Sequence, residues 1–162
     1  MKIGRQMKFE EIFEAYWQRV FRLCMGYVND YHLAQDLAQD SFVLVWQNLS
    51  NFREEAKLGT WIFRIASNRC LRQIENQSRN VNSSLPPHLI EEKQESIEPR
   101  IAFLYQCISE LPEIDRIIIS LELEDIKQAE IANILGLSEA NVRVKIHRIK
   151  EKLTKKFREN GH

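Results

Sequence analysis

The chain of 162 residues has 44% hydrophobic and 28% charged residues, with only 5 Gly and 4 Pro. This composition excludes a disordered or fibrous protein and is typical of a helix-rich globular one. The formal net charge is zero, but the charges are unevenly distributed. Residues 52–80 carry six Lys or Arg against three Glu, residues 138–162 carry eight against three, and residues 91–125 carry ten acids against three bases. Two basic segments around an acidic one indicate two contacts with a polyanion.

The cysteines and the N-terminus suggest the cellular compartment. Cys24, Cys70 and Cys107 are far apart and form no pair at the two-residue spacing of zinc or redox motifs. We therefore expect buried, reduced thiols, no metal site and no other cofactor. Neither a signal-peptide core nor an apolar run of membrane-spanning length occurs, so we expect a cytoplasmic protein without membrane insertion.

Hydrophobic periodicity predicts three helices in the first half of the chain, at about 9–28, 31–48 and 58–77. The inner, apolar faces of the first two include Phe9, Phe13 and Trp46. The second helix has a largely acidic and amidic outer face, formed by Asp36, Gln39, Asp40, Val43 and Gln47. In the third helix Arg64, Asn68 and Arg72 are spaced four residues apart, so they share one face.

Between Asn76 and Pro99 the periodicity fails, and Pro86-Pro87 blocks helix continuation. The sequence therefore predicts an all-α protein with two small helical domains, residues 1–78 and 99–162, joined by a flexible linker at 79–98.

Helical periodicity resumes after Pro99. Four further helices are expected, at 101–109, from Pro112 onward, at 127–135 and at 139–157. No segment has a sustained period of two, so no sheet is expected.

Residues 128–138 have the pattern of a helix-turn-helix. Gly136 can turn the chain in a left-handed conformation, and Ser138 is placed to cap the next helix. In that helix a buried stripe of Val142, Ile146, Ile149 and Leu153 leaves basic residues on the outer face, which can lie in the major groove of DNA. An ordinary helical hairpin with a solvated basic face is the alternative.

Several segments resemble the sigma-70 family of RNA polymerase sigma factors, in its extracytoplasmic-function subgroup. Residues 35–46 (QDLAQDSFVLVW), Phe52-Arg53 and residues 60–70 (TWIFRIASNRC) resemble region 2 of that family. Leu111-Pro112-Glu113 and the helix-turn-helix resemble region 4. The resemblance implies a factor without catalytic activity that binds core RNA polymerase and directs it to promoter DNA. Many members are held by an anti-sigma factor, which is therefore an expected partner.

The resemblance also implies roles for three sets of residues. The set expected to bind the clamp of the polymerase's largest subunit is Asp36, Gln39, Asp40 and Val43. The set expected to bind and open the -10 element is Phe52, Arg53, Arg64, Asn68 and Arg72, with an unpaired base captured by the loop before the third helix. The set expected to read the -35 element is Arg143, Val144, Lys145, His147 and Arg148. The spacing of Trp61 favours a core role over base stacking.

The sequence departs from the family pattern in two places. Glu54-Glu55 stands where a glycine commonly follows Phe-Arg, so the base preference of the loop is left open. Val144 and His147 replace the more usual residues of the recognition helix, so the -35 sequence cannot be predicted. His147 has no second ligand at a supporting spacing and is expected at the surface or in the groove rather than on a metal.

Two other classes of function are compatible with parts of the sequence. The first is a dimeric one-component regulator with residues 1–80 as a sensor or dimerisation domain, which leaves the second basic surface unexplained. Its dimeric state would distinguish it from a sigma factor. The second is an enzyme, but the sequence has no nucleophile-base pair, phosphate-binding glycine loop or metal-ligand cluster.

Overall fold

The computed structural model describes residues 2–53, 57–77 and 97–161. Its elements are α1 (Lys2–Val28), α2 (Tyr31–Asn48), the short 3-10 helix η1 (Leu49–Asn51), α3 (Leu58–Gln77), α4 (Pro99–Ser109), α5 (Glu113–Leu123), α6 (Gln128–Leu135) and α7 (Glu139–Glu159). No strand occurs in this described part of the chain, which confirms the all-α prediction.

The turn between α1 and α2 explains why α1 ends and α2 begins where the sequence predicts. Asn29 adopts a positive φ of 48°, which a short polar side chain tolerates. The Asp30 carboxylate then accepts a hydrogen bond from the Leu33 N–H at 3.0 Å and caps α2. Pro112 is the N-cap of α5 rather than its first residue.

The helix-turn-helix prediction is confirmed in detail. Gly136 ends α6 in the left-handed conformation, with φ 69° and ψ 31°. The Leu137 N–H donates to the Ala132 carbonyl at 3.0 Å. Ser138 Oγ accepts a hydrogen bond from the Asn141 N–H at 3.1 Å and caps α7. The predicted apolar stripe of α7 is buried.

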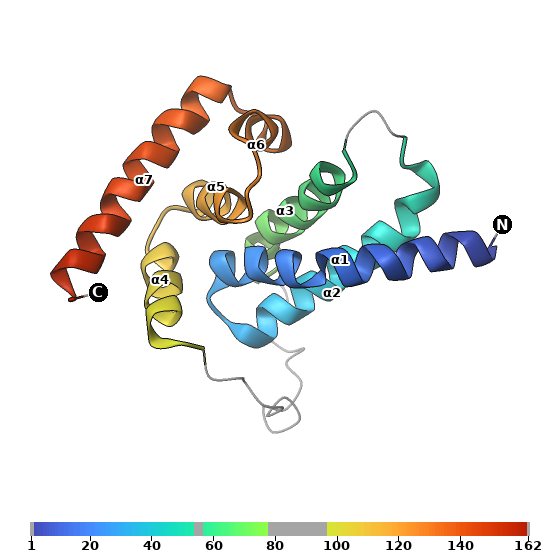
Figure 1. The fold of residues 1–162 in the computed structure, drawn as a ribbon, viewed down its shortest axis with the longest axis horizontal. Helices are drawn as coiled ribbons and strands as arrows, with labels where there is room; N and C mark the ends of the chain where they lie inside the picture. Colours follow the sequence, from blue (N-terminus) through green and yellow to red (C-terminus); the bar gives the residue numbers. More distant parts are fainter. Residues whose placement is uncertain (1, 54–56, 78–96, 162) are drawn as a thin grey trace.

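Helix α1 is the element on which the others assemble. It contacts α2 and α3, with which it forms an N-terminal group, and also α4 and α5 of the C-terminal group formed by α4–α7 (Figure 1). Helices α5 and α6 lie between α7 at one edge of the molecule and α1 and α3 (Figure 1). One continuous cluster of buried hydrophobic residues includes members of both groups.

The predicted division into domains at 1–78 and 99–162 stays a prediction, because most of the segment 79–98 lies outside the described residues. Within the described ranges the two groups of helices are packed together rather than apart: α1 contacts α5, and α3 contacts α6. The hydrophobic residues that join them are therefore part of the same core.

The three cysteines are buried free thiols, as expected. Cys24 Sγ of α1 and Cys70 Sγ of α3 are 3.7 Å apart. The mutual hydrogen bond and the burial raise the pKa of the Cys24 thiol, so it is an unreactive core residue. Among the helices described, none has the length and apolar character needed to cross a membrane.

Candidate nucleic-acid and partner interfaces

The outer face of α2 is accessible where the resemblance implies a polymerase contact. The side chains of its four predicted residues are exposed: Asp36, Gln39, Asp40 and Val43. The Asp40 carboxylate accepts hydrogen bonds from the Arg69 guanidinium of α3 at 2.7 and 3.1 Å. Asp36 has no hydrogen-bond or ion-pair partner among the described residues, and partial burial together with the nearby Asp40 charge raises its pKa. A basic partner would therefore stabilise the charged form of Asp36.

An apolar groove of about 780 Å³ adjoins this face. Its lining comes from α1 and α2 alone: Phe9, Glu10, Phe13, Gln39, Phe42, Val43 and Trp46. Phe13 and Trp46 are each 38% exposed, so their predicted place on inner faces is wrong in part. The reason is that none of the other described helices lines this end of the α1–α2 pair. The exposed aromatic side chains beside Val43 form an apolar surface next to the polar face of α2. An apolar patch with a polar border is typical of an interaction site.

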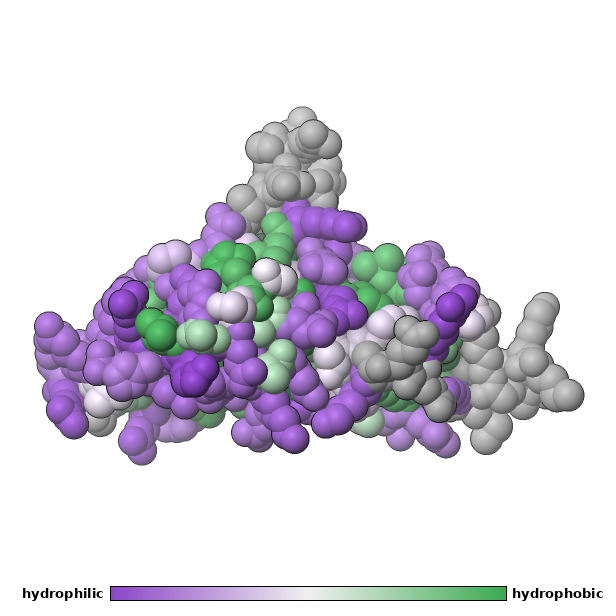
Figure 2. All heavy atoms as spheres, turned by 90° about the horizontal axis from the view of Figure 1, so that it is seen from above, coloured by the Kyte–Doolittle hydropathy of each residue, from purple (hydrophilic) through white to green (hydrophobic). Residues whose placement is uncertain are grey.

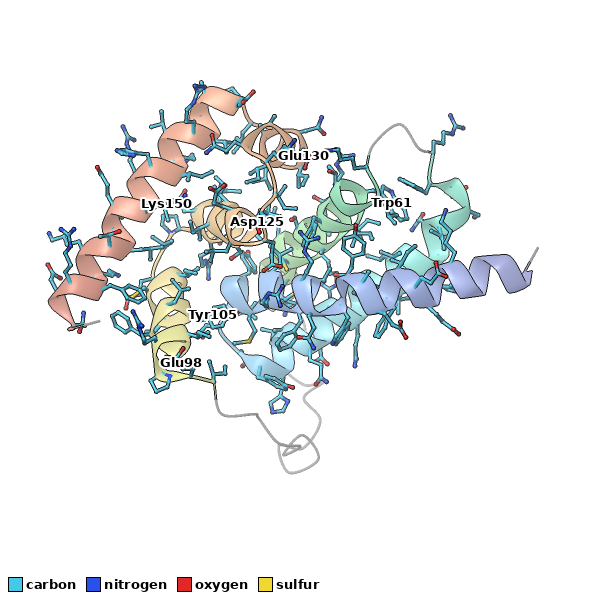
Figure 3. The ribbon with its side chains drawn as sticks, in the orientation of Figure 1. Trp61, Glu98, Tyr105, Asp125, Glu130 and Lys150 are labelled. Atoms are coloured by element: carbon cyan, nitrogen blue, oxygen red, sulfur yellow. The ribbon has the colours of Figure 1, made fainter. Side chains whose placement is uncertain are left out.

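The basic face of α3 is only partly open. Asn68 and Arg72 are exposed, whereas Arg64 is half-buried and donates a hydrogen bond to Asn133 Oδ1 of α6. Just before α3, Lys57 Nζ is 3.3 Å from the Glu130 carboxylate of α6, and Figure 3 shows Glu130 beside this end of α3. Helix α6 therefore covers one end of the surface expected to bind the -10 element.

The loop before α3 is described only in part. The Phe52 ring packs against the Trp61 ring with centroids 4.8 Å apart, and Arg53 is exposed. Trp61 packs against the core, which confirms its expected structural role. Glu54 and Glu55 lie outside the described residues, so the base-capturing pocket stays a prediction.

The outer face of α7 is accessible at four of its five predicted positions: Arg143, Val144, His147 and Arg148 are exposed. Lys145 is the exception, because it is half-buried and its Nζ is 3.5 Å from the Asp115 carboxylate of α5. His147 Nε2 is 3.0 Å from the Glu151 carboxylate.

The acidic segment of the sequence binds the opposite side of α7. Lys150 Nζ is 3.1 Å from the Glu122 carboxylate, as the inward position of Lys150 in Figure 3 illustrates. Lys156 pairs with Glu110, the residue that directly follows α4. These pairs hold α7 against α4 and α5, while Arg143 and Arg148 have no polar partner within the described chain and stay available to a phosphate or a base.

Ionic contacts between the two groups of helices were not predicted from the sequence. The Arg22 guanidinium of α1 donates two hydrogen bonds, both of 2.8 Å, to the buried carboxylate of Glu124. That carboxylate raises the pKa of Arg22. Arg19 donates to the Glu124 backbone carbonyl at 2.6 Å. The sequence did not single out Arg19 and Arg22 as partners of Glu124, because the outer face of α1 carries other charged residues as well.

The face of the molecule shown in Figure 2 is mostly hydrophilic, with hydrophobic residues gathered in small patches between the polar ones. Within the ranges described, no cluster of three or more His, Cys, Asp or Glu side chains could hold a metal ion.

Two family models match the sequence. Sigma-70 region 2 matches residues 12–80, and Sigma-70, region 4 matches residues 104–153. The chain is 27% identical to the ECF RNA polymerase sigma factor SigW of Bacillus subtilis, with 98% of this chain and 94% of SigW covered. It is 28% identical to the RNA polymerase sigma-H factor of Pseudomonas aeruginosa, with 94% and 87% covered.

Solved structures with the same fold include two complexes with other proteins. The sigma factor RpoE in complex with the anti-sigma factor NepR from Bartonella quintana has a TM-score of 0.74 at 18% identity, with 91% of this chain and 95% of that chain covered. CnrH in complex with the cytosolic domain of CnrY has a TM-score of 0.70 at 21% identity, with 95% and 90% covered.

Two substitutions separate base reading from phosphate binding on α7. The resemblance implies a base contact for Arg148, so Arg148→Ala is expected to cost about 1–3 kcal/mol at one position of a -35 duplex library. Lys155→Ala, nearly two turns further along, should weaken binding to all sequences equally and reduce the salt dependence by about one unit of slope. The measurement is library binding by the full chain at two salt concentrations. Equal sequence profiles for wild type and Arg148→Ala would contradict base reading through Arg148.

Proposed function

The chain belongs to the extracytoplasmic-function subgroup of the sigma-70 family of RNA polymerase sigma factors, and we propose that it binds core RNA polymerase and directs it to promoters by recognising -10 and -35 elements and helping to open the DNA. The observation that carries this proposal is the presence of three different surfaces on one chain. These are the acidic and apolar face of α2, the Asn68–Arg72 face of α3 and the outward arginines of α7.

The first surface is proposed to dock on the clamp of the polymerase's largest subunit. Asp36 offers an unpaired carboxylate, which suits an arginine-rich partner. Val43 is 53% exposed and lines the aromatic groove, so apolar partner side chains could be buried beside the ionic contact. Asp40 would exchange its intramolecular Arg69 partner for one on the polymerase, so its net contribution to affinity is expected to be smaller than that of Asp36.

The second surface is proposed to bind the -10 element during opening. Exposed Asn68 can hydrogen-bond the edge of an unpaired base, and Arg72 can bind a neighbouring phosphate. Phe52 and Arg53 precede α3 and belong to the loop that would capture the base. Unpairing one base costs a few kcal/mol, which contacts to the extruded base offset.

The third surface is proposed to enter the major groove of the -35 element. The outward side chains are those of Arg143, Val144, His147 and Arg148. Lys145 is paired with Asp115 of α5 and would have to leave this partner to contact the DNA. Residues 1–78 and 99–162 are proposed to act as separate modules on the two elements, with 79–98 as the connection between them. The protein is proposed to work in the cytoplasm, and RNA synthesis itself would be the chemistry of the polymerase.

An anti-sigma factor is the proposed regulator. Both structural neighbours are complexes with another protein, and one of them is a sigma factor with an anti-sigma factor. The aromatic groove of α1 and α2 provides accessible apolar area for such a partner.

The direct test is run-off transcription with purified core polymerase on genomic fragments. Discrete transcripts that depend on the added protein are expected. A dimer that binds DNA alone and yields no transcript with core polymerase would instead support a one-component regulator.

The polymerase contact is tested by charge reversal. Asp36→Lys should reduce association with core polymerase by about tenfold or more, since a favourable ion pair becomes a like-charge contact, while the helical fold is kept because Asp36 is exposed. Glu11→Lys is the matched control, because Glu11 is an exposed acid of α1 that does not line the groove. Equal binding of both variants to immobilised core polymerase would refute the assignment of this face.

The contact with the opened element is tested by Asn68→Ala. Loss of one base contact should cost about 1–3 kcal/mol, so transcription should fall on promoters with one base at the captured position more than on others. Binding to a -35 duplex should stay unchanged. If Asn68→Ala lowered the melting temperature and weakened all promoters equally, Asn68 would have a structural role instead.

A further inference from the structure

One apolar side chain stands on the basic outer face of α7. Val144 is 47% exposed, and within α7, a helix described throughout, it is the only large hydrophobic residue that is exposed. The buried stripe of α7 is formed by Val142, Ile146, Ile149 and Leu153. At about 100° per residue, Val144 lies directly opposite the centre of this stripe. Helix α7 forms one edge of the molecule (Figure 1), so Val144 points away from the rest of the chain.

Neither helix stability nor a protein contact accounts for an exposed valine at this position. A β-branched side chain loses rotamer freedom in a helix, so valine is a weaker helix former than Arg or Lys. A protein interface has a continuous apolar centre. Val144 instead has Arg143 and Lys145 as its chain neighbours, and His147 and Arg148 follow one turn later. An apolar group within a basic surface suits a partner that sets apolar groups among negative charges.

Val144 differs from its polar neighbours because it has no partner to give up. Lys145 Nζ is 3.5 Å from the Asp115 carboxylate of α5, and His147 Nε2 is 3.0 Å from the Glu151 carboxylate. Each of these two basic groups must leave a carboxylate before it can donate to DNA. Val144 needs no such exchange, so it is already available to a base edge.

The major-groove edges of the four bases carry a single apolar group, the C5-methyl of thymine. An aliphatic side chain recognises this methyl by van der Waals contact and by excluding water. Arginine recognises guanine instead, through the O6 and N7 acceptors. Val144 stands four residues before Arg148, so the two share one side of α7 and are about 6 Å apart along its axis. With a rise of about 3.4 Å per base pair, this spacing covers about two base pairs.

We propose that Val144 is a specificity-determining residue of this factor, which reads the C5-methyl group of one thymine in the -35 element. This thymine lies within about two base pairs of the base that Arg148 contacts. The inference deepens the proposed function and rests on it, because α7 must enter the groove of that element for Val144 to meet a base. It narrows the -35 sequence, which the amino-acid sequence alone leaves open, to an A·T pair at this position.

The first test removes the methyl group alone. Deoxyuridine has the base-pairing edge of thymidine and lacks only its C5-methyl. Each thymine on either strand of the -35 element, in a promoter found by run-off transcription, is replaced in turn by deoxyuridine. The measurement is binding of the holoenzyme that the full chain forms with core polymerase. One replacement should weaken binding about fourfold, the effect of losing one buried methyl group, and the others should change it little.

A matched pair of variants assigns the effect to Val144. Val144→Ser removes the aliphatic contact, so thymine and deoxyuridine should bind equally at the sensitive position. The fold should be kept because the side chain is exposed, and the melting temperature checks this. Thr154→Ala is the control, because Thr154 is an exposed residue of α7 that also loses a methyl group and belongs to no proposed surface. Its preference for thymine should equal that of wild type.

A second probe supplies the same methyl group on another base. A C·G pair replaces the T·A pair at the sensitive position, with the cytosine either unmodified or methylated at C5. Wild-type holoenzyme should bind the methylated duplex about fourfold more tightly than the unmodified one. The Val144→Ser holoenzyme should bind both equally.

The outcomes separate this inference from the proposed function. Wild-type holoenzyme that binds its promoter selectively but is insensitive to every deoxyuridine would overturn the reading of a methyl group. A methyl effect that persists in Val144→Ser would overturn it as well, and so would a sensitive position more than about two base pairs from the one altered by Arg148→Ala. If wild type gives no core-dependent transcript, the proposed function fails and this inference fails with it.

Discussion

The close crossing of α1 with α5 at Gly26 is the contact on which the arrangement of this molecule depends. Because no side chain separates the backbones there, the buried faces of both helical groups merge into one core. The crossing also brings Glu124 within reach of Arg22, and it lays α6 along one end of α3. The joint packing, the pairing of Glu124 with Arg22 and the partial covering of α3 by α6 therefore follow from a single approach between helices.

The chain has no net charge, yet basic side chains on α3 and α7 are exposed, because several of its acids pair with other basic residues inside the molecule. The carboxylates of Asp115, Glu110 and Glu122 pair with lysines on the inward side of α7. Glu124 binds arginines of α1 in the same way. Outward arginines on α7 and α3 are left without such partners, so position rather than total charge decides what the surface attracts.

The sequence predicts the helices and most exposed site residues because their causes are local. Asp30, Gly136 and Ser138 act within a few residues of themselves, so their effects can be deduced from spacing. The contact of Arg22 with Glu124 joins residues 102 apart, and α1 and α5 carry no periodic signal that pairs them. Trp46 is exposed because no helix besides α1 and α2 lines the groove in which it lies, and this depends on tertiary packing. Long-range contacts thus account for the features of the site that the pattern missed.

Docking of the acidic and apolar face of α2 on core RNA polymerase is the contact that the proposed function needs first. The measurement is photo-cross-linking to core polymerase from Gln47, an exposed residue of α2, with Glu11, an exposed residue of α1, as the control position. A cross-link to the largest subunit from Gln47 and none from Glu11 is the expected result. No cross-link from Gln47 in a complex that initiates transcription would contradict the docking of this face.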